Sequence, residues 1–304
     1  MFFLKRVAFA VPLLLVISFL AFALVRATPG GPFDRERAPA SPEIRHQIER
    51  KYHLDEPLWK QYARYLGDLV HGDFGPSLRY RNHTVNDVIA QALPVSAVLG
   101  LLAFGFALGV GLPAGFFSAA RRGRWPDYAG SLAAVVAVCV PALVIAPLLI
   151  LVFAIQWRLL PVALWGTPLH AVLPTIALGL YYAGKIARLF REGLLHTLQA
   201  EYIITARAKG LGENAILLRH AVRPAVLPVV SYLGPMLADL LTGSFVIENI
   251  FQIPGLGVYF ISSSLNQDYT MTVGLALLYA MLLIGLNLAV DFAYTLLDPR
   301  VKYE

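Results

Sequence analysis

The sequence predicts an all-α integral membrane protein with six transmembrane helices. Of its 304 residues, 58% are hydrophobic and only 14% are charged, a composition outside the usual range of soluble domains. A helix needs about 20 apolar residues to cross a bilayer. Six segments reach that length, at about 7–27, 92–119, 129–156, 170–190, 225–247 and 271–297. An even number of spans places both termini on one side of the membrane.

The first segment predicts an uncleaved transmembrane helix within residues 1–28. Lys5 and Arg6 precede an apolar run from Val7 to Val25, which is longer than the roughly 7 to 15 residues of a signal-peptide core. Ala21–Ala23 also fits a signal-peptide cleavage site. In either case the five later spans keep the protein in the membrane.

The distribution of basic residues predicts the orientation. Lys and Arg are enriched in short cytoplasmic loops, and here they follow the second span (Arg121–Arg124), the fourth (Lys185–Arg223) and the sixth (Arg300 and Lys302). Only Arg158 lies between spans three and four, and no Lys or Arg lies between spans five and six. Both termini are therefore expected in the cytoplasm. The net charge of +6 reflects this topology and does not indicate a nucleic-acid partner.

Residues 29–91 form a polar insert, which this orientation places on the external side. Between Pro42 and Leu66 its apolar and aromatic residues recur at helical spacing, which predicts one or two short amphipathic helices. The insert is either a lid packed on the spans or a surface for an external binding protein. The spaced residues are Ile44, Ile48, Tyr52, Leu54, Leu58, Tyr62 and Tyr65.

Small residues and prolines indicate how the spans pack. The pairs Gly105/Gly109 and Gly111/Gly115 in the second span have the spacing that lets membrane helices approach closely. Prolines remove backbone donors and are expected to kink their helices. They are Pro141 and Pro147 in the third span and Pro228 and Pro235 in the fifth.

No enzyme active site is predicted. The run Gly179–Ile186 nearly fits the phosphate loop G-x-x-x-x-G-K-[ST], but Ile186 replaces the hydroxyl residue and the run ends an apolar helix instead of following a strand. If ATP drives this protein, another chain must bind it. Four of the seven histidines lie in the insert, at His46, His53, His71 and His83, without the spacing of a metal site.

Three polar residues within predicted spans are candidates for a translocation path. Ionisable groups in the bilayer are costly and usually face a cavity or a partner. Asp239 lies deep in the fifth span, and Asn287 and Asp291 lie four residues apart on the sixth, so they share a helix face. They either line the path or form structural hydrogen bonds with a neighbouring helix.

Residues 192–224 predict a helix, a turn and a second helix on the cytoplasmic side. The first helix runs from His196 to Ala208, a break follows at Gly210–Gly212, and the second helix runs from about Asn214 to Arg223. Asn214 is expected to cap the second helix, and glycine suits the left-handed geometry that ends the first. On the second helix an apolar stripe adjoins a basic one. Such a surface binds either a protein partner or anionic lipid headgroups.

The segment Thr205–Gly210 with Pro224 resembles the cytoplasmic EAA loop of permease subunits of binding-protein-dependent ABC importers, in the T-A-R-A-K-G-L form of the oligopeptide and dipeptide group. In this chain Ile204 stands where the family loop has a glutamate, and Glu201 lies one turn earlier. The resemblance extends over nearly the whole chain. Its other motifs are Arg26–Gly30 with Pro32 and Phe33, Lys51–Pro57, His71–Ser77, Val246–Phe251, Pro254–Gly257 and Asp298–Arg300.

The resemblance implies the type I permease fold, with a core from residue 92 to 304, in an ATP-driven importer of oligopeptides or dipeptides in the bacterial inner membrane. It also implies four kinds of partner: a second homologous permease, two ATPase subunits that bind ATP and Mg, an extracytoplasmic solute-binding protein, and the peptide. This chain itself is expected to bind no cofactor. The alternative is a stand-alone secondary transporter or channel, for which an internal repeat or ion-coupling carboxylates are expected.

The resemblance also assigns roles to residues. The contacts to the ATPase are expected at Thr205, Ala206, Arg207, Lys209, Gly210, Arg219 and His220. The outer gate, or a contact to the binding protein, is expected at Glu248, Pro254, Gly255 and Gly257.

Overall fold

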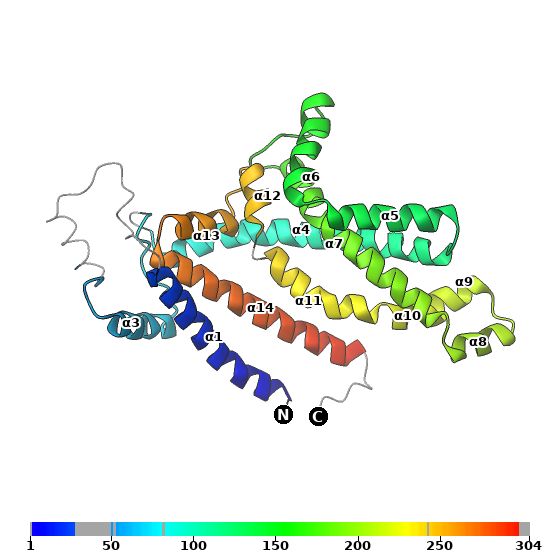
Figure 1. The fold of residues 1–304 in the computed structure, drawn as a ribbon, viewed down its shortest axis with the longest axis horizontal. Coiled ribbons are helices and arrows are strands. Elements are labelled where there is room, and N and C mark those ends of the chain that lie inside the picture. The colour runs from blue at the N-terminus through cyan, green and yellow to red at the C-terminus, as the bar shows by residue number, and fades with distance from the viewer. Residues whose placement is uncertain (1, 28–49, 51–52, 81–82, 242, 298–304) are drawn as a thin grey trace. The chain divides into compact units, whose positions relative to one another are not determined.

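The computed structural model describes residues 2–27, 50, 53–80, 83–241 and 243–297. These residues are almost entirely helical and include no β-strand (Figure 1). The helices are α1 (Phe2–Ala27), α3 (Leu58–Val70), α4 (Val85–Ala120), α5 (Trp125–Cys139), α6 (Ala142–Leu149), α7 (Pro168–Thr197), α8 (Glu201–Ala208), α9 (Glu213–Ala215), α10 (Val222–Ala225), α11 (Leu227–Leu241), α12 (Phe245–Ile250), α13 (Leu256–Leu265) and α14 (Tyr269–Leu297). Two π-helical segments, Ile150–Gln156 and Ile216–Ala221, continue α6 and α9.

The chain divides into two compact units. Unit 1 comprises Met1–Val95 and Pro254–Ile284, and unit 2 comprises Ser96–Ile253 and Gly285–Glu304. This division differs from the sequence-based segmentation, because residues 254–284 group with the N-terminal part of the chain. The external insert at 29–91 and the core at 92–304 stay predictions, since the division by packing does not report on membrane topology.

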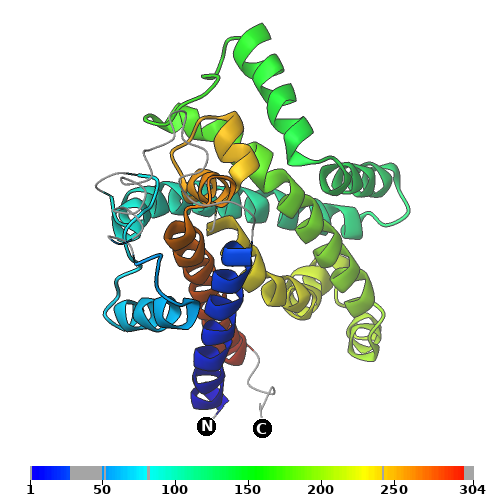
Figure 2. The same ribbon diagram turned by 60° about the vertical axis from the view of Figure 1, so that its left-hand side comes forward.

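In unit 1, α3 lies beside α1 (Figures 1 and 2). The hydroxyl oxygens of Ser18 and Tyr62 are 2.8 Å apart, and the buried ring of Tyr65 packs with Val273 and Leu277 of α14. The predicted amphipathic helix of the insert is thus present at Leu58–Val70, and Tyr62 and Tyr65 lie on it. Three residues of the predicted pattern, Ile44, Ile48 and Tyr52, lie outside the described residues.

A buried carboxylate holds unit 1 together at the end of α13. Asp268 is fully buried and accepts a 2.5 Å hydrogen bond from the Ser77 hydroxyl. Its oxygens also accept from the backbone amides of Leu78, Arg79 and Met271, each at 3.2 Å. The segment before α4 is therefore tied to the α13–α14 connection, which explains why these distant stretches form one unit.

In unit 2, α7 packs closely on α4 where glycines remove side-chain bulk. A Cβ at Gly115 would lie 2.5 Å from the carbonyl oxygen of Ala187, and one at Gly111 would lie 2.7 Å from that of Ala183. The predicted close approach is confirmed for this pair. It is wrong for Gly105 and Gly109 within the described part of the chain, where no atom lies within 4 Å of an added Cβ.

The apolar segments are helical as predicted, and length and apolar composition identify four or five of them as candidate spans. Four described helices are long and apolar enough to cross a membrane, and a fifth span results if the bent pair α5 and α6 is counted as one. The predicted fourth span lies within α7, which is less apolar. Six spans and cytoplasmic termini therefore stay predictions.

The third predicted span is broken, not merely kinked. α5 ends at Cys139, and after a break at Val140 and Pro141 the chain continues as α6 at an angle of 105°. Val140 has extended backbone geometry, because proline disfavours the helical conformation for the residue before it, and Pro141 has no amide hydrogen with which to continue α5. Pro147 and Pro235 lie inside helices, and Pro228 is the second residue of α11.

Candidate functional site

The predicted cytoplasmic helix pair is present in unit 2, after α7 (Figure 1). α8 ends at Ala208, the chain turns at Gly210 with φ +81°, and α9 begins at Glu213. This positive φ favours glycine, which lacks the Cβ that makes the left-handed conformation costly. Two details of the prediction were wrong. His196 belongs to α7, since three residues separate α7 from α8, and Asn214 lies inside α9 and does not cap it.

A small apolar core joins the two helices of the pair. Ile203 and Ala206 of α8 and Ile216 of the second helix are buried together, with Leu198 and Ala200 packed against them. Ala206, one of the predicted contact residues, therefore faces this core. The other six predicted contacts are exposed: Thr205, Arg207, Lys209, Gly210, Arg219 and His220. We call the exposed residues of 201–220 the coupling surface.

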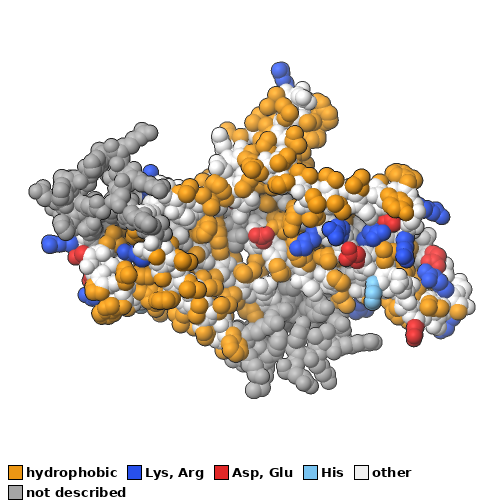
Figure 3. Space-filling view, viewed as in Figure 1, with side chains coloured by type: hydrophobic (Ala, Val, Ile, Leu, Met, Phe, Trp, Pro, Cys, Tyr) orange, Lys and Arg blue, Asp and Glu red, His pale blue; other side chains and the backbone are white. Residues whose placement is uncertain are grey.

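The coupling surface carries both charged and apolar side chains. Its charged residues are Arg207, Lys209 and Arg219, which are basic, and Glu201 and Glu213, which are acidic. Figure 3 shows Lys and Arg side chains gathered over the part of unit 2 that includes α7 and α8. Ile204 and Leu218 are 58% and 63% exposed, and exposed large apolar side chains next to charges are typical of protein contact surfaces. Sequence reasoning treated Ile204 only as a departure from the family glutamate. Its exposure makes it part of the coupling surface.

An ion pair closes the turn between the two helices. The Arg207 guanidinium donates to both carboxylate oxygens of Glu213, at 2.7 and 3.2 Å. The hydrogen bond from Arg207 lowers the pKa of Glu213 below its ordinary value, although partial burial acts in the opposite direction. Arg207 is therefore held within the pair while part of its side chain, 43% exposed, remains accessible.

A second ion pair anchors α7, the helix that leads into the coupling surface. Asp127, whose side chain is 5% exposed, accepts two hydrogen bonds from Arg191, at 2.7 and 2.9 Å. Its oxygens also accept from the Ser118 hydroxyl at 2.7 Å and the Gly123 amide at 3.0 Å. One carboxylate thus joins the ends of α4, α5 and α7. Sequence reasoning missed it, although an acidic residue beside an apolar run was an available signal.

Of the three predicted path residues, Asp239 has a defined neighbourhood. The hydroxyl of Tyr182 on α7 donates a short hydrogen bond to its carboxylate, and Asp239 itself is exposed. Nearby, the Lys185 ammonium lies 4.1 Å from the ring centroid of Tyr232. Asn287 is half-buried on α14, and the side chain of Asp291 lies outside the described residues.

The predicted outer-gate residues fall in both units. In unit 2, Glu248 is fully buried and accepts a 2.8 Å hydrogen bond from the Ser96 hydroxyl. A residue without exposed surface does not contact a partner in this conformation. In unit 1, Pro254 is exposed, whereas Gly255 and Gly257 are buried.

Two family models together cover nearly the whole chain. The model of the binding-protein-dependent transport system inner membrane component matches residues 111–303, and the model of the N-terminal part of such components matches residues 1–99. The chain belongs to this permease family. No group of three or more His, Cys, Asp or Glu side chains in its described part is placed to hold a metal ion.

Curated relatives support the same assignment to the permease family. The chain is 44% identical to the oligopeptide transport system permease protein OppB of Haemophilus influenzae, over 99% of both chains. It is equally similar to OppB of Salmonella typhimurium. It is 43% identical to the dipeptide transport system permease protein DppB of Bacillus subtilis, over 95% of this chain and 94% of the relative.

Solved structures show that the permease fold is that of ABC importers. A chain of the MetNI methionine ABC transporter in an inward-facing conformation aligns with a TM-score of 0.58 and 16% identity, over 69% of this chain and 96% of the other. The protein is therefore an all-helical, multi-pass inner membrane protein of the type I importer fold. It is a translocation component and not an ATPase, and the alternative of a secondary transporter is not supported.

Proposed function

We propose that this permease forms half of the transmembrane pathway of an ATP-driven importer of oligopeptides or dipeptides. The proposal of a peptide substrate is supported by 42–44% identity to permeases of oligopeptide and dipeptide transport systems over at least 94% of their length. A second, homologous permease supplies the other half. An extracytoplasmic solute-binding protein delivers the peptide.

The observation that carries this proposal is the coupling surface. It presents exposed apolar side chains and charges of both signs on a helix pair with its own buried core, which suits a groove on another protein better than an anionic lipid surface. We infer that two ATPase subunits bind ATP and Mg. One docks on the coupling surface of this chain, and the other docks on the second permease. Their closure on ATP then moves the helix pair and shifts the spans between inward-open and outward-open states.

The docking step is tested by purifying tagged protein in mild detergent and identifying the associated chains by mass spectrometry. Two ATPase chains, a second permease and a solute-binding protein are expected, and peptides bound to the last partner identify the substrate. Leu218→Glu places a charge on the coupling surface and should abolish recovery of the ATPase. Leu159→Glu, at an equally exposed leucine (65% against 63%), is the control and should retain it. Recovery of the chain alone would overturn the coupling role.

We further propose that Asp239, with Asn287 and Asp291, lines the path. The exposed carboxylate of Asp239, which accepts a hydrogen bond from Tyr182, is a group that a peptide amine can recognise. Alanine at each of the three positions should reduce peptide uptake while the complex remains assembled. Normal uptake and assembly in a variant would remove that residue from the path.

On the external side we propose that Pro254, Gly255 and Gly257 contribute to the outer gate. Glu248, the fourth residue assigned to that gate, accepts a hydrogen bond from Ser96. The insert at 29–91 is the proposed resting surface for the binding protein. Reversing the charge of its exposed acidic residues should slow delivery from the binding protein. Unchanged delivery would exclude the insert from that contact.

A further inference from the structure

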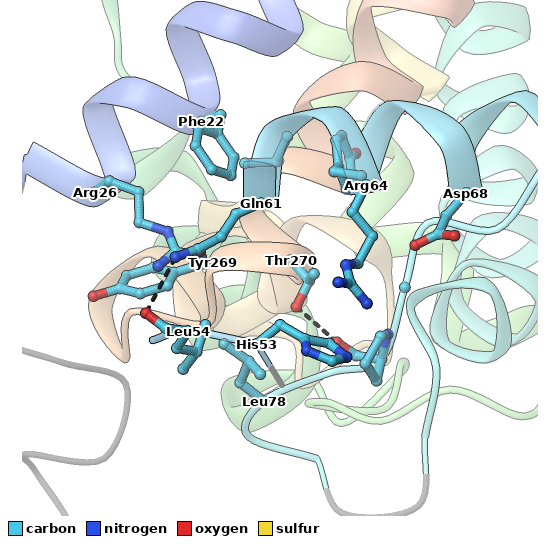
Figure 4. Close-up of a pocket in the computed structure, with 14 residues that line it drawn as sticks. Phe22, Arg26, His53, Leu54, Gln61, Arg64, Asp68, Leu78, Tyr269 and Thr270 are labelled. Carbon is cyan, nitrogen blue, oxygen red and sulfur yellow. Dashed lines mark hydrogen bonds between the residues drawn. The ribbon is translucent and has the colours of Figure 1, made fainter. Parts of the chain in front are cut away.

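Unit 1 contains a cavity of about 170 Å³ between α1, α3, the start of α14 and the segment before α4 (Figure 4). Its lining includes Phe22 and Arg26 from the last turns of α1, Gln61 and Tyr65 from α3, and Tyr269 and Val273 from α14. An apolar cavity of roughly 150 Å³ is large enough to bind benzene. A small organic molecule therefore fits here.

Three buried polar atoms at this cavity lack a hydrogen-bond partner among the described residues: Arg26 Nε, Gln61 Oε1 and the Tyr65 hydroxyl. Gln61 and Tyr65 are only 8% and 7% exposed. The Gln61 amide is fixed, because its Nε2 donates to the carbonyl oxygens of Leu54 and Glu56 at 3.1 and 2.6 Å. Unpaired buried polar groups are costly and rare in native proteins, and three in one cavity indicate a missing ligand.

The buried charge at the cavity favours an anion, because Arg26 is half-buried whereas Asp68, the one carboxylate of the lining, is exposed. Arg26 lies 4.4 Å from the ring centroid of Tyr269 and 5.2 Å from that of Phe22, and it forms no ion pair with a described carboxylate. The other arginine of the lining, Arg64, is already paired with Glu56 at 3.0 Å. Burial raises the pKa of the Tyr65 hydroxyl, so this group remains protonated and donates. Arg26 Nε and the Tyr65 hydroxyl are therefore two donors without acceptors among the described residues.

We infer that this cavity binds a small amphipathic anion, whose carboxylate or phosphate oxygens accept from Arg26 and Tyr65. A hydroxyl or N–H group of the ligand donates to Gln61 Oε1, and its apolar part packs on Phe22 and Val273. Two sources offer this chemistry: the headgroup of an anionic phospholipid, such as phosphatidylglycerol, and a soluble organic acid. The lining shares no residue with the proposed peptide path or with the proposed ATPase contacts.

The experiment uses the full-length protein, purified with its associated chains, in nanodiscs. One arm compares phosphatidylcholine discs with and without phosphatidylglycerol, and native mass spectrometry counts the retained lipid. The other arm titrates mandelate, a small hydroxy acid with an apolar ring, into phosphatidylcholine discs by calorimetry. Arg26→Gln and Tyr65→Phe are the test variants. Arg79→Gln, at an exposed arginine outside the lining, and Tyr62→Phe, whose hydroxyl is already paired, are matched controls.

Specific binding in one arm is expected, and that arm identifies the source. Arg26→Gln should weaken it by about 10-fold or more, because a charge-assisted hydrogen bond is lost. Tyr65→Phe should weaken it by about 3- to 10-fold, as for a neutral hydrogen bond. The two controls should bind normally. Absence of specific binding in both arms, or equal affinity in all variants, would overturn the inference and leave ordered water as the occupant.

Discussion

The guanidinium Nε of Arg207 lies 2.7 Å from a carboxylate oxygen of Glu213, across the turn at Gly210. Arg207 was predicted as a contact to another protein, and the structure gives it a partner in the same loop. Both side chains are largely exposed, and an exposed pair stabilises a protein by less than about 1 kcal/mol. The pair therefore sets the geometry of the coupling surface more than it stabilises the fold.

Removing this ion pair should increase local opening of the turn at 209–213 and leave the free energy of global unfolding nearly unchanged. In Glu213→Gln we expect the free energy of unfolding to fall by less than about 1 kcal/mol. Amide hydrogen exchange at 209–213 should become faster, because the turn loses its side-chain closure. The charge-swapped double variant Arg207→Glu/Glu213→Arg should restore slow exchange. Unchanged exchange in Glu213→Gln would show that the turn is held by its backbone alone.

The pH dependence of the turn follows from the lowered pKa of Glu213. A depressed pKa in the folded state contributes stability above the unfolded value, about 4.3 for glutamate, and the contribution is lost as the pH falls through the folded value. Exchange protection of 209–213, corrected for the intrinsic pH dependence, should therefore be constant from about pH 9 to pH 5 and decline only below about pH 4. Loss of protection near pH 6 would contradict this assignment.

The ion pair between Asp127 and Arg191 should contribute far more to stability, because Asp127 is buried. Asp127→Asn leaves the Arg191 charge without its partner, and breaking a buried pair costs on the order of 3 kcal/mol. Thermal unfolding in detergent should show a clear loss of stability. Glu192→Gln, at the exposed neighbour of Arg191, should unfold like the parent. Equal stability of both variants would mean that solvent already screens the pair.

The elements that local sequence determines were predictable, and those that depend on distant pairing were not. Apolar runs located the long helices, and the motif at Thr205–Gly210 located the coupling surface. The partner of Asp127 lies 64 residues away and that of Asp268 lies 191 residues away, and no local pattern specifies such pairs. The pairs Gly105/Gly109 and Gly111/Gly115 have the same sequence spacing. Only the arrangement of the helices decides which pair faces α7.

The carboxylate of Asp268 provides a test of how unit 1 is held together. Its two oxygens accept from the hydroxyls of Ser77 and Thr270 and from three backbone amides, so Asp268→Asn replaces an acceptor with a donor that faces other donors. Buried groups left without partners cost about 1 to 3 kcal/mol each. Limited proteolysis should therefore cleave the segment 75–80 faster in this variant. Asp55→Asn, at an exposed aspartate outside that segment, is the control and should resist cleavage.

The close packing of α4 on α7 gives a prediction with a control in the same helix. An added Cβ at Gly115 would meet the Ala187 carbonyl at 2.5 Å, so Gly115→Ala must push the helices apart, and overpacking of this kind costs about 1 to 3 kcal/mol. At Gly105 the described residues leave the space open, and alanine is favoured over glycine in a helix by roughly 1 kcal/mol. Thermal unfolding should show a loss for Gly115→Ala and no loss for Gly105→Ala. A loss at Gly105 instead would indicate that this face of α4 packs against another chain.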